Sequence, residues 1–90
     1  NGKLDGLYTV WYENRQKKEE GTYKNGKKDG LNTWWYENGQ IETKGKYKNG
    51  NQDGLWTWWY KNGQKKFELN FKDGEWISEK KWNEDGSVKE

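Results

Sequence analysis

A chain of 90 residues with a net charge of +2 forms one small domain and cannot bury a large core. Without Cys or His it has no disulfide bonds, no thiolate metal site and no histidine acid–base chemistry. Only 28% of the residues are hydrophobic, but 8 Trp, 6 Tyr and 2 Phe are available for burial. Each aromatic side chain can bury roughly 150–250 Å². We therefore expect a folded domain with an aromatic core.

The sequence repeats with a period of 24 residues, marked by Asp-Gly-Leu at Asp5, Asp29 and Asp53. The three copies read DGLYTVWYENRQ, DGLNTWWYENGQ and DGLWTWWYKNGQ, and a fourth, shorter copy starts at Asp73. Such a period is typical of an array in which each unit packs on its neighbours. We assign a single domain, 1–90, with repeats at about 1–24, 25–48 and 49–72 and a shortened capping repeat at 73–90.

Each repeat contains two predicted strands. In the second copy the first strand covers 31–36, rich in Thr, Trp and Tyr, and the second covers 40–48. Asn38-Gly39 between them predicts a two-residue type I′ turn, because both central residues of that turn need positive φ. The connection at 25–30 is predicted to be a longer hairpin loop. In the first copy Asn14-Arg15 replaces Asn-Gly, so we expect a looser turn or one of another type there.

Strand, tight turn, strand and loop, repeated along the chain, predict an all-β fold. Connections of two to six residues leave no room for the crossover helices that parallel strands need. The expected architecture is a repeat array of antiparallel β-hairpins that form a single elongated, twisted meander sheet of about seven or eight strands. The charged fourth repeat should cap the array.

Alternation along the strands sorts the side chains onto two faces. One face carries positions that are identical in all three copies, and we predict that Trp11, Trp35 and Trp59 on it belong to the core, while which face of the sheet is buried is left open. The identical positions are Leu7, Thr9 and Trp11, then Leu31, Thr33 and Trp35, then Leu55, Thr57 and Trp59.

The second strand complicates this assignment, because a two-residue turn would place Lys and Glu beside Trp35. Either aromatic side chains pack on both faces with Lys stems over Trp rings, or a bulge near Thr43 and Lys44 shifts the register. Both alternatives stay open. Gly21 and Gly45 occupy positions where a large ring could lie flat on the backbone.

The other face carries the positions that differ between copies. Exposed Trp and Tyr can stack on sugars, on bases or on the hot-spot residues of a protein partner. The candidate partner surface consists of Tyr8, Trp34, Trp56 and Trp58.

Catalytic and metal chemistry find no support in the sequence. The recurring Asp5, Asp29, Asp53 and Asp73 are interpreted as turn contacts, because Asp is favoured in Asp-Gly turns. No nucleophile–base pair is visible, so we expect no enzyme activity, no catalytic or metal-binding residues and no cofactor. Lys alternates with Glu and Asp, and Arg15 is the one Arg among 17 basic residues, so no nucleic-acid partner is expected.

The unit at 23–40, YKNGKKDGLNTWWYENGQ, recurs at 47–64 as YKNGNQDGLWTWWYKNGQ. This combination resembles the bacterial variant of the MORN repeat (MORN type 2) and the YwqK-like antitoxin family. The resemblance covers nearly the whole chain. It implies β-hairpin repeats in one sheet and a non-catalytic role through protein contact, which in the antitoxin case is the binding of a toxin.

A carbohydrate or cell-wall binding module of the choline- or glucan-binding type is the alternative, because Trp-Tyr dipeptides and Asn-Gly turns occur there too. Membrane association is not expected from this segment, since no apolar run approaches the ~20 residues of a membrane span. The expected location is the bacterial cytoplasm or, if a leader was removed, the cell exterior or surface. The oligomeric state and the identity of the partner are left open.

Overall fold

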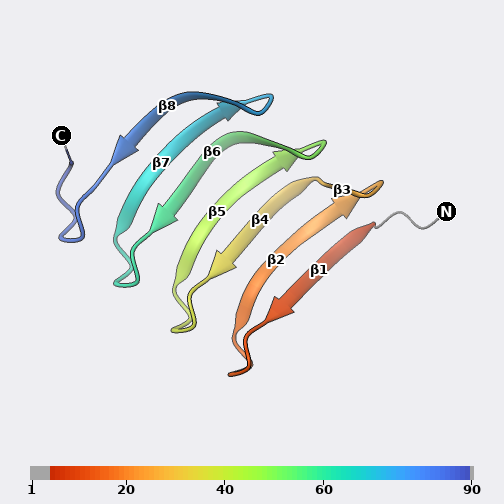
Figure 1. Ribbon diagram of the computed structural model, residues 1–90, viewed down its shortest axis with the longest axis horizontal. Helices are drawn as coiled ribbons and strands as arrows, with labels where there is room; N and C mark the ends of the chain where they lie inside the picture. Colours follow the sequence, from red (N-terminus) through yellow and green to blue (C-terminus); the bar gives the residue numbers. More distant parts are fainter. Residues whose placement is uncertain (1–4, 90) are drawn as a thin grey trace.

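The computed structural model describes residues 5–89, which form one antiparallel sheet (Figure 1). The strands follow the chain in the order β1-β2-β4-β5-β6-β7-β8, with the short β3 also paired to β2. The strands are β1 (Gly6–Trp11), β2 (Lys17–Lys24), β3 (Lys27–Lys28), β4 (Gly30–Trp35), β5 (Ile41–Lys48), β6 (Asn51–Trp59), β7 (Lys65–Lys72) and β8 (Glu75–Lys81).

The predicted all-β meander is confirmed. The molecule measures 49 × 36 × 11 Å, and a thickness of 11 Å corresponds to a single layer of sheet. Its radius of gyration is 14.5 Å, against about 12 Å for a compact domain of this length. Across residues 5–89 there is no helix of the length and apolarity that a membrane crossing requires. Because the sheet is a single layer, each side chain can be buried only by its neighbours on the same face.

The two kinds of connection are exchanged relative to the prediction. The two-residue turns lie where a longer loop was expected, and both of their central residues have positive φ, as a type I′ turn requires. These turns are Asn25-Gly26, Asn49-Gly50 and Asp73-Gly74.

The connection at Asn38-Gly39 is a three-residue loop, so the type I′ prediction for it was wrong. The N–H of Gly39 donates to the Tyr36 carbonyl at 3.0 Å, and the N–H of Tyr36 donates to the Gln40 carbonyl at 2.8 Å. Gly39 has φ 88°, as expected for a type I turn followed by one left-handed residue. The Asn38 side chain stabilises this geometry, because its Oδ1 accepts from the Gln40 N–H at 2.9 Å.

The first repeat builds the same loop although Arg15 stands in place of Gly. Arg15 has φ 73°, and its N–H donates to the Tyr12 carbonyl at 3.0 Å. The turn is therefore not looser than its counterparts, and it is of another type than I′, as they are. The local hydrogen bonds of Asn14, to the Gln16 N–H and the Glu37 carbonyl, are those of the other repeats and hold Arg15 in the left-handed region.

A bulge follows each of these loops. Trp34 pairs with Thr43 and Trp35 pairs with Ile41, so Glu42 is an extra residue in β5. Lys18 and Lys66 are the extra residues of the first and third repeats. The bulge that was left open near Thr43 and Lys44 is thus present, one residue earlier. Lys stems cover Trp rings as well, since Lys17 Nζ lies 5.8 Å from the centre of the Trp35 ring.

Side chains tie each repeat to the next at both ends of the strands. At one end a Tyr hydroxyl donates to a main-chain carbonyl of the following repeat, as in Tyr12 to Trp35 at 2.6 Å and Tyr36 to Trp59 at 2.6 Å. At the other end the Asp29 carboxylate accepts from the Asn49 N–H at 3.1 Å. Asp5 makes the same contact with the Asn25 N–H, so both carboxylates accept from the turn of the next repeat, whereas Asp73 lies within its own two-residue turn. Residues 5–89 contain no group of three or more potential metal ligands.

The fourth repeat forms the same three-residue loop but lacks the side-chain donors that link each earlier repeat to the next. The Asn83 N–H donates to the Ser87 carbonyl at 2.8 Å and the Gly86 N–H donates to the Asn83 carbonyl at 2.9 Å. Asn83 stands where the earlier repeats have Tyr, and Asp85 stands where they have a donating Asn. This end of the array therefore lacks the side-chain donors with which a repeat holds its successor, in keeping with a capping role.

Candidate binding surface

The two faces of the sheet differ in what they bury. We call one of them the aromatic face; it carries Tyr8, Trp34, Tyr47, Trp56, Trp58, Phe67 and Phe71. The other, the Leu-Thr-Trp face, carries the nine invariant positions from Leu7 to Trp59. The two largest fully buried side chains, Trp56 and Asn32, are each 1% exposed and belong to the aromatic face.

The prediction that Trp11, Trp35 and Trp59 belong to the core was wrong for Trp11, and Trp35 and Trp59 are only half-buried. Leu7 is 72% exposed and Trp11 is 57% exposed, and Leu31 and Leu55 are more than half exposed. In the register of the sheet Leu31 pairs with Lys46, which is itself exposed and leaves most of Leu31 accessible to solvent. Only the Thr positions in the middle of this face are buried, at Thr33 and Thr57.

Glycine makes burial possible on the aromatic face. Trp56 lies flat against Gly45, and a Cβ on Gly45 would lie 2.0 Å from its ring. The Trp56 Nε1–H donates to the Lys46 carbonyl at 3.0 Å, which satisfies the indole in its buried position. At Gly21 a Cβ would meet Asn32 Oδ1 at 1.8 Å. The sequence-based expectation that a ring could lie on the backbone is thus confirmed at Gly45, whereas Gly21 carries the Asn32 amide.

The first part of the aromatic face is a polar cluster. The Tyr8 hydroxyl donates to the Glu19 carboxylate and lies 3.0 Å from Asn32 Oδ1. Asn32 Nδ2 donates to the same carboxylate at 3.2 Å, and Lys28 Nζ pairs with it at 3.3 Å. Every polar side chain of this cluster therefore has a partner, which makes its partial burial tolerable.

The pKa values of the cluster follow from these contacts. Burial, followed by the Glu19 carboxylate, raises the pKa of Tyr8 to about 12. Burial opposes ionisation of Glu19, but hydrogen bonds from Tyr8 and Asn32 and the charge of Lys28 outweigh it and lower the Glu19 pKa. The pKa of Lys28 is raised, because the interactions with Glu19 outweigh the effect of its burial. The cluster is thus a closed hydrogen-bond network with an ion pair.

The second part of the aromatic face is a tryptophan cluster around Trp56. The ring centres of Trp34 and Trp58 lie 5.7 and 5.9 Å from that of Trp56, tilted by 39° and 33°. Tyr47 meets Trp56 edge-on at 5.0 Å, and Phe67 stacks on Trp58 at 4.6 Å. Trp34 and Trp58 remain half-buried, so rigid indole surface faces solvent on both sides of the buried ring.

A hollow of about 210 Å³ lies over this cluster. Trp34, Trp56 and Trp58 line it together with Thr43 and Glu42. Glu42 is the extra residue of the β5 bulge, which brings its carboxylate to the same side as Thr43. Aromatic walls and one carboxylate give this hollow both apolar and negative character.

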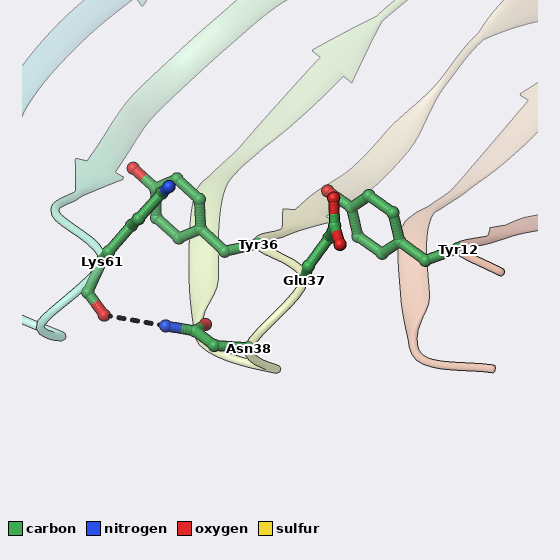
Figure 2. A pocket seen from close by; sticks show the side chains of 5 residues that line it. All are labelled: Tyr12, Tyr36, Glu37, Asn38 and Lys61. Carbon is green, nitrogen blue, oxygen red and sulfur yellow. Dashed lines mark hydrogen bonds between the residues drawn. The ribbon is translucent and has the colours of Figure 1, made fainter. Parts of the chain in front are cut away.

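A second hollow, of about 370 Å³, lies between the loops of neighbouring repeats (Figure 2). Tyr12, Tyr36, Glu37, Asn38 and Lys61 line it, and Asn38 Nδ2 donates to the Lys61 carbonyl at 3.1 Å. Its tyrosines and its Asn38 are occupied in the ties between repeats. We therefore attribute this hollow to the array scaffold and not to recognition.

The structure brings the four sequence-predicted residues to one face but gives them different tasks. Trp34 and Trp58 flank the hollow, Tyr8 belongs to the polar cluster, and Trp56 is the floor. Trp56 is 1% exposed, so its prediction as a direct partner contact does not fit its burial. Sequence reasoning missed Glu42 and Thr43 at the hollow, since their placement depends on a bulge whose position alternation alone cannot fix.

An open meander of hairpin repeats with a patterned aromatic face defines a class of non-globular repeat sheets. The family model for the MORN repeat variant matches residues 1–25, 28–49 and 52–73, and the chain therefore belongs to that family. MORN repeats commonly mediate interactions with proteins and membranes. No curated protein and no solved structure is similar enough to match the chain.

Proposed function

We propose that this chain is a non-catalytic protein-interaction module whose partner docks on the aromatic face. The observation that carries the proposal is the pair of half-buried indoles, Trp34 and Trp58, fixed against the buried Trp56. Aromatic side chains that are held rigid before binding lose little conformational entropy on complex formation, and Trp is enriched among binding hot spots.

The opposite face is a weaker candidate for specific recognition. It presents the same Leu, Thr and Trp in each repeat, separated by Lys44 and Lys46 of β5. A uniform surface offers little to distinguish one partner from another. The aromatic face differs from repeat to repeat, from Tyr8 to Asn32 to Trp56 at one position, and can therefore encode a particular partner.

Within this class we favour the antitoxin role, in which the partner is a toxin enzyme that the sheet neutralises by covering it. The support is the resemblance of the repeat unit to the YwqK-like antitoxins, together with a surface that needs no chemistry of its own. The antitoxin role is narrower than the module proposal and can fail separately.

Chemical cross-linking in cells, with two matched double variants, tests the module. Trp34→Ser with Trp58→Ser alters the aromatic face, and Leu31→Ser with Leu55→Ser alters the other face by the same number of apolar side chains. Far-UV circular dichroism and thermal unfolding should first show that both variants are folded. We expect one specific protein to be cross-linked to the unaltered chain and to the Leu variant, and to be lost from the Trp variant.

Loss from the Leu variant alone would move the site to the opposite face, and no specific protein in any sample would reject the module. If the cross-linked protein is an enzyme, equimolar addition of the purified chain should inhibit it. A bound protein whose activity is unaffected would reject the antitoxin role only. A fluorescence response to choline or glycans in the absence of any protein partner would favour the carbohydrate-binding alternative.

A further inference from the structure

The bulge residue that follows each hairpin loop differs in sign between repeats. In the first repeat Lys18 Nζ lies 5.7 Å from the centre of the Tyr12 ring. In the third repeat Lys66 Nζ lies 5.7 Å from Tyr60 and 5.9 Å from Phe67. The flanking repeats thus place a cation of their own over aromatic rings at this position. The middle repeat has Glu42 there, so it supplies a carboxylate where its neighbours supply an ammonium group.

Glu42 lies among the aromatic side chains that line the hollow. Among residues 5–89 it makes no ion pair and no side-chain hydrogen bond. Burial raises the pKa of Tyr36 and of Tyr12, and the charge of Glu42 raises both further. The hollow of about 210 Å³ that it lines is therefore negative and walled by π-faces.

The chain already builds a cation site of this kind one strand away. Lys28 Nζ lies 5.4 Å from the Trp34 ring and 5.3 Å from the Tyr47 ring, and it pairs with Glu19 at 3.3 Å. That site combines an indole, a phenol and a carboxylate around one ammonium group. Since Glu19 neutralises Lys28, the lysine does not cancel the charge of Glu42. Trp34 is shared between this filled site and the hollow beside it.

We propose that the hollow lined by Trp34, Trp56, Trp58 and Glu42 binds a basic side chain of the partner protein. The guanidinium or ammonium group stacks on the half-buried indoles and pairs with the Glu42 carboxylate, as Lys28 does internally with Trp34 and Glu19. This inference rests on the proposed function and adds the chemistry of the partner residue. It predicts that the partner inserts an Arg or a Lys between Trp34 and Trp58.

Titration of the indole N–H signals in NMR spectra tests the site without the partner. The probes are a blocked Gly-Arg-Gly peptide, its Lys counterpart, the same peptide with neutral citrulline in place of Arg, and choline. We expect the Arg or the Lys peptide to shift the signals of Trp34 and Trp58, and the citrulline peptide to shift neither. The affinity should fall as salt is added, because the pairing is electrostatic and partly exposed.

The variant Glu42→Lys is the decisive one, because Lys is the residue of the two equivalent positions and fits the same bulge. It should abolish the response to the Arg and Lys peptides, and Glu42→Gln should weaken the affinity about fivefold or more. The matched control is Glu37→Gln, which removes a nearby carboxylate that lines the other hollow and should leave the affinity unchanged.

Equal shifts with the citrulline peptide, or unchanged affinity in Glu42→Lys, would overturn the proposal. Choline binding at least tenfold tighter than both peptides would also overturn it, since the ligand would then be a small quaternary ammonium compound. If neither peptide binds while the Trp34→Ser, Trp58→Ser variant still loses its cross-linked protein, the proposed interaction module is supported and the proposed basic partner residue is rejected. If the peptides bind while that variant keeps its partner, the docking surface is misplaced.

Discussion

Equivalent positions of the aromatic face hold a polar network in the first repeat and a tryptophan cluster further along. The position of Tyr8 becomes Asn32 and then Trp56, and the position of Glu19 becomes Thr43 and then Phe67. The backbone is the same in both regions, with the same three-residue loops and bulges. The backbone fold is therefore independent of which side chains occupy the aromatic face, and these side chains can vary to suit a partner.

The ties between repeats explain this independence. The Tyr hydroxyl, the loop Asn and the Asp carboxylate act at the ends of the strands and recur in the polar and the apolar region alike. The centre of each strand can then exchange polar for apolar side chains, provided that a small residue leaves room. Gly21 and Gly45 leave that room, whereas Leu69 occupies it in the third repeat.

The largest expected effect comes from removing the centre of the tryptophan cluster. Trp56→Ala should lower the free energy of unfolding by about 3–5 kcal/mol, because it empties the most enclosed aromatic position. A loss of this size unfolds most of the molecules of a marginal domain. Urea denaturation followed by circular dichroism measures it. Trp76→Ala on β8, where the ring is 58% exposed, is the matched control, and an equal loss in both variants would contradict a core at Trp56.

The next largest effect on stability distinguishes the two glycines, Gly45 and Gly21, on which buried side chains of the aromatic face lie. Gly45→Ala should cost about 1–3 kcal/mol of unfolding free energy, since the new methyl group meets the buried indole of Trp56. Gly21→Ala should cost less, because its methyl group displaces the short Asn32 side chain, with loss of that residue's hydrogen bonds to Tyr8 and Glu19, and no fused ring has to move. Denaturation midpoints of the two variants make the comparison. A costlier Gly21→Ala would show that the polar cluster is the more rigid of the two.

The polar cluster should make the stability of the protein depend on pH in the acidic range. Tyr8→Phe removes a hydrogen bond from Glu19 and should cost about 1 kcal/mol at neutral pH. The Glu19 pKa is lowered by folding, so its contribution is present above its ordinary pKa of 4.5 and is lost as the pH falls through the folded value. Without the Tyr8 hydroxyl the folded pKa rises towards the ordinary one. Stability measured below pH 4.5 should therefore fall less steeply in Tyr8→Phe, and an unchanged slope would remove Tyr8 from the network.

The smallest expected effect concerns the loop of the first repeat. Arg15→Gly should raise the unfolding free energy by about 0.5 kcal/mol, because relief of the left-handed strain exceeds the added entropy of the unfolded chain. The reverse change at the equivalent position, Gly39→Ala, should destabilise. Thermal unfolding measures both, and a loss of stability in Arg15→Gly would mean that the Arg15 side chain contributes contacts of its own.

The fold follows from the sequence because it depends on local chemistry that recurs. Alternating Thr, Trp and Tyr, frequent Gly and short connections predict antiparallel hairpins, and the period predicts an array. The turns were harder to assign, because Asn-Gly occurs at both ends of the repeat. The Asn49-Gly50 pair forms the type I′ turn. The Asn38 side chain instead accepts a hydrogen bond from the Gln40 N–H, and its loop has three residues.

The buried face could not be predicted from repetition. Leu31 and Trp35 recur because they belong to the repeat unit, yet Leu31 is 54% exposed and Trp35 is half-buried. In a single-layer sheet the face that carries the glycines is the one where large rings can settle on the backbone. The position of Gly45 was the available signal, and Glu42 became visible at the hollow only once the bulge was placed.

Fluorine NMR of protein labelled with fluorotryptophan tests most directly the claim that the aromatic face holds the core. The change in each fluorine shift between H₂O and D₂O reports the solvent exposure of that indole. We predict the smallest change at Trp56, intermediate changes at Trp34 and Trp58, and large changes at Trp11 and Trp76. Shielded rings at Trp11, Trp35 and Trp59 with an exposed Trp56 would contradict it and return the core to the Leu-Thr-Trp face.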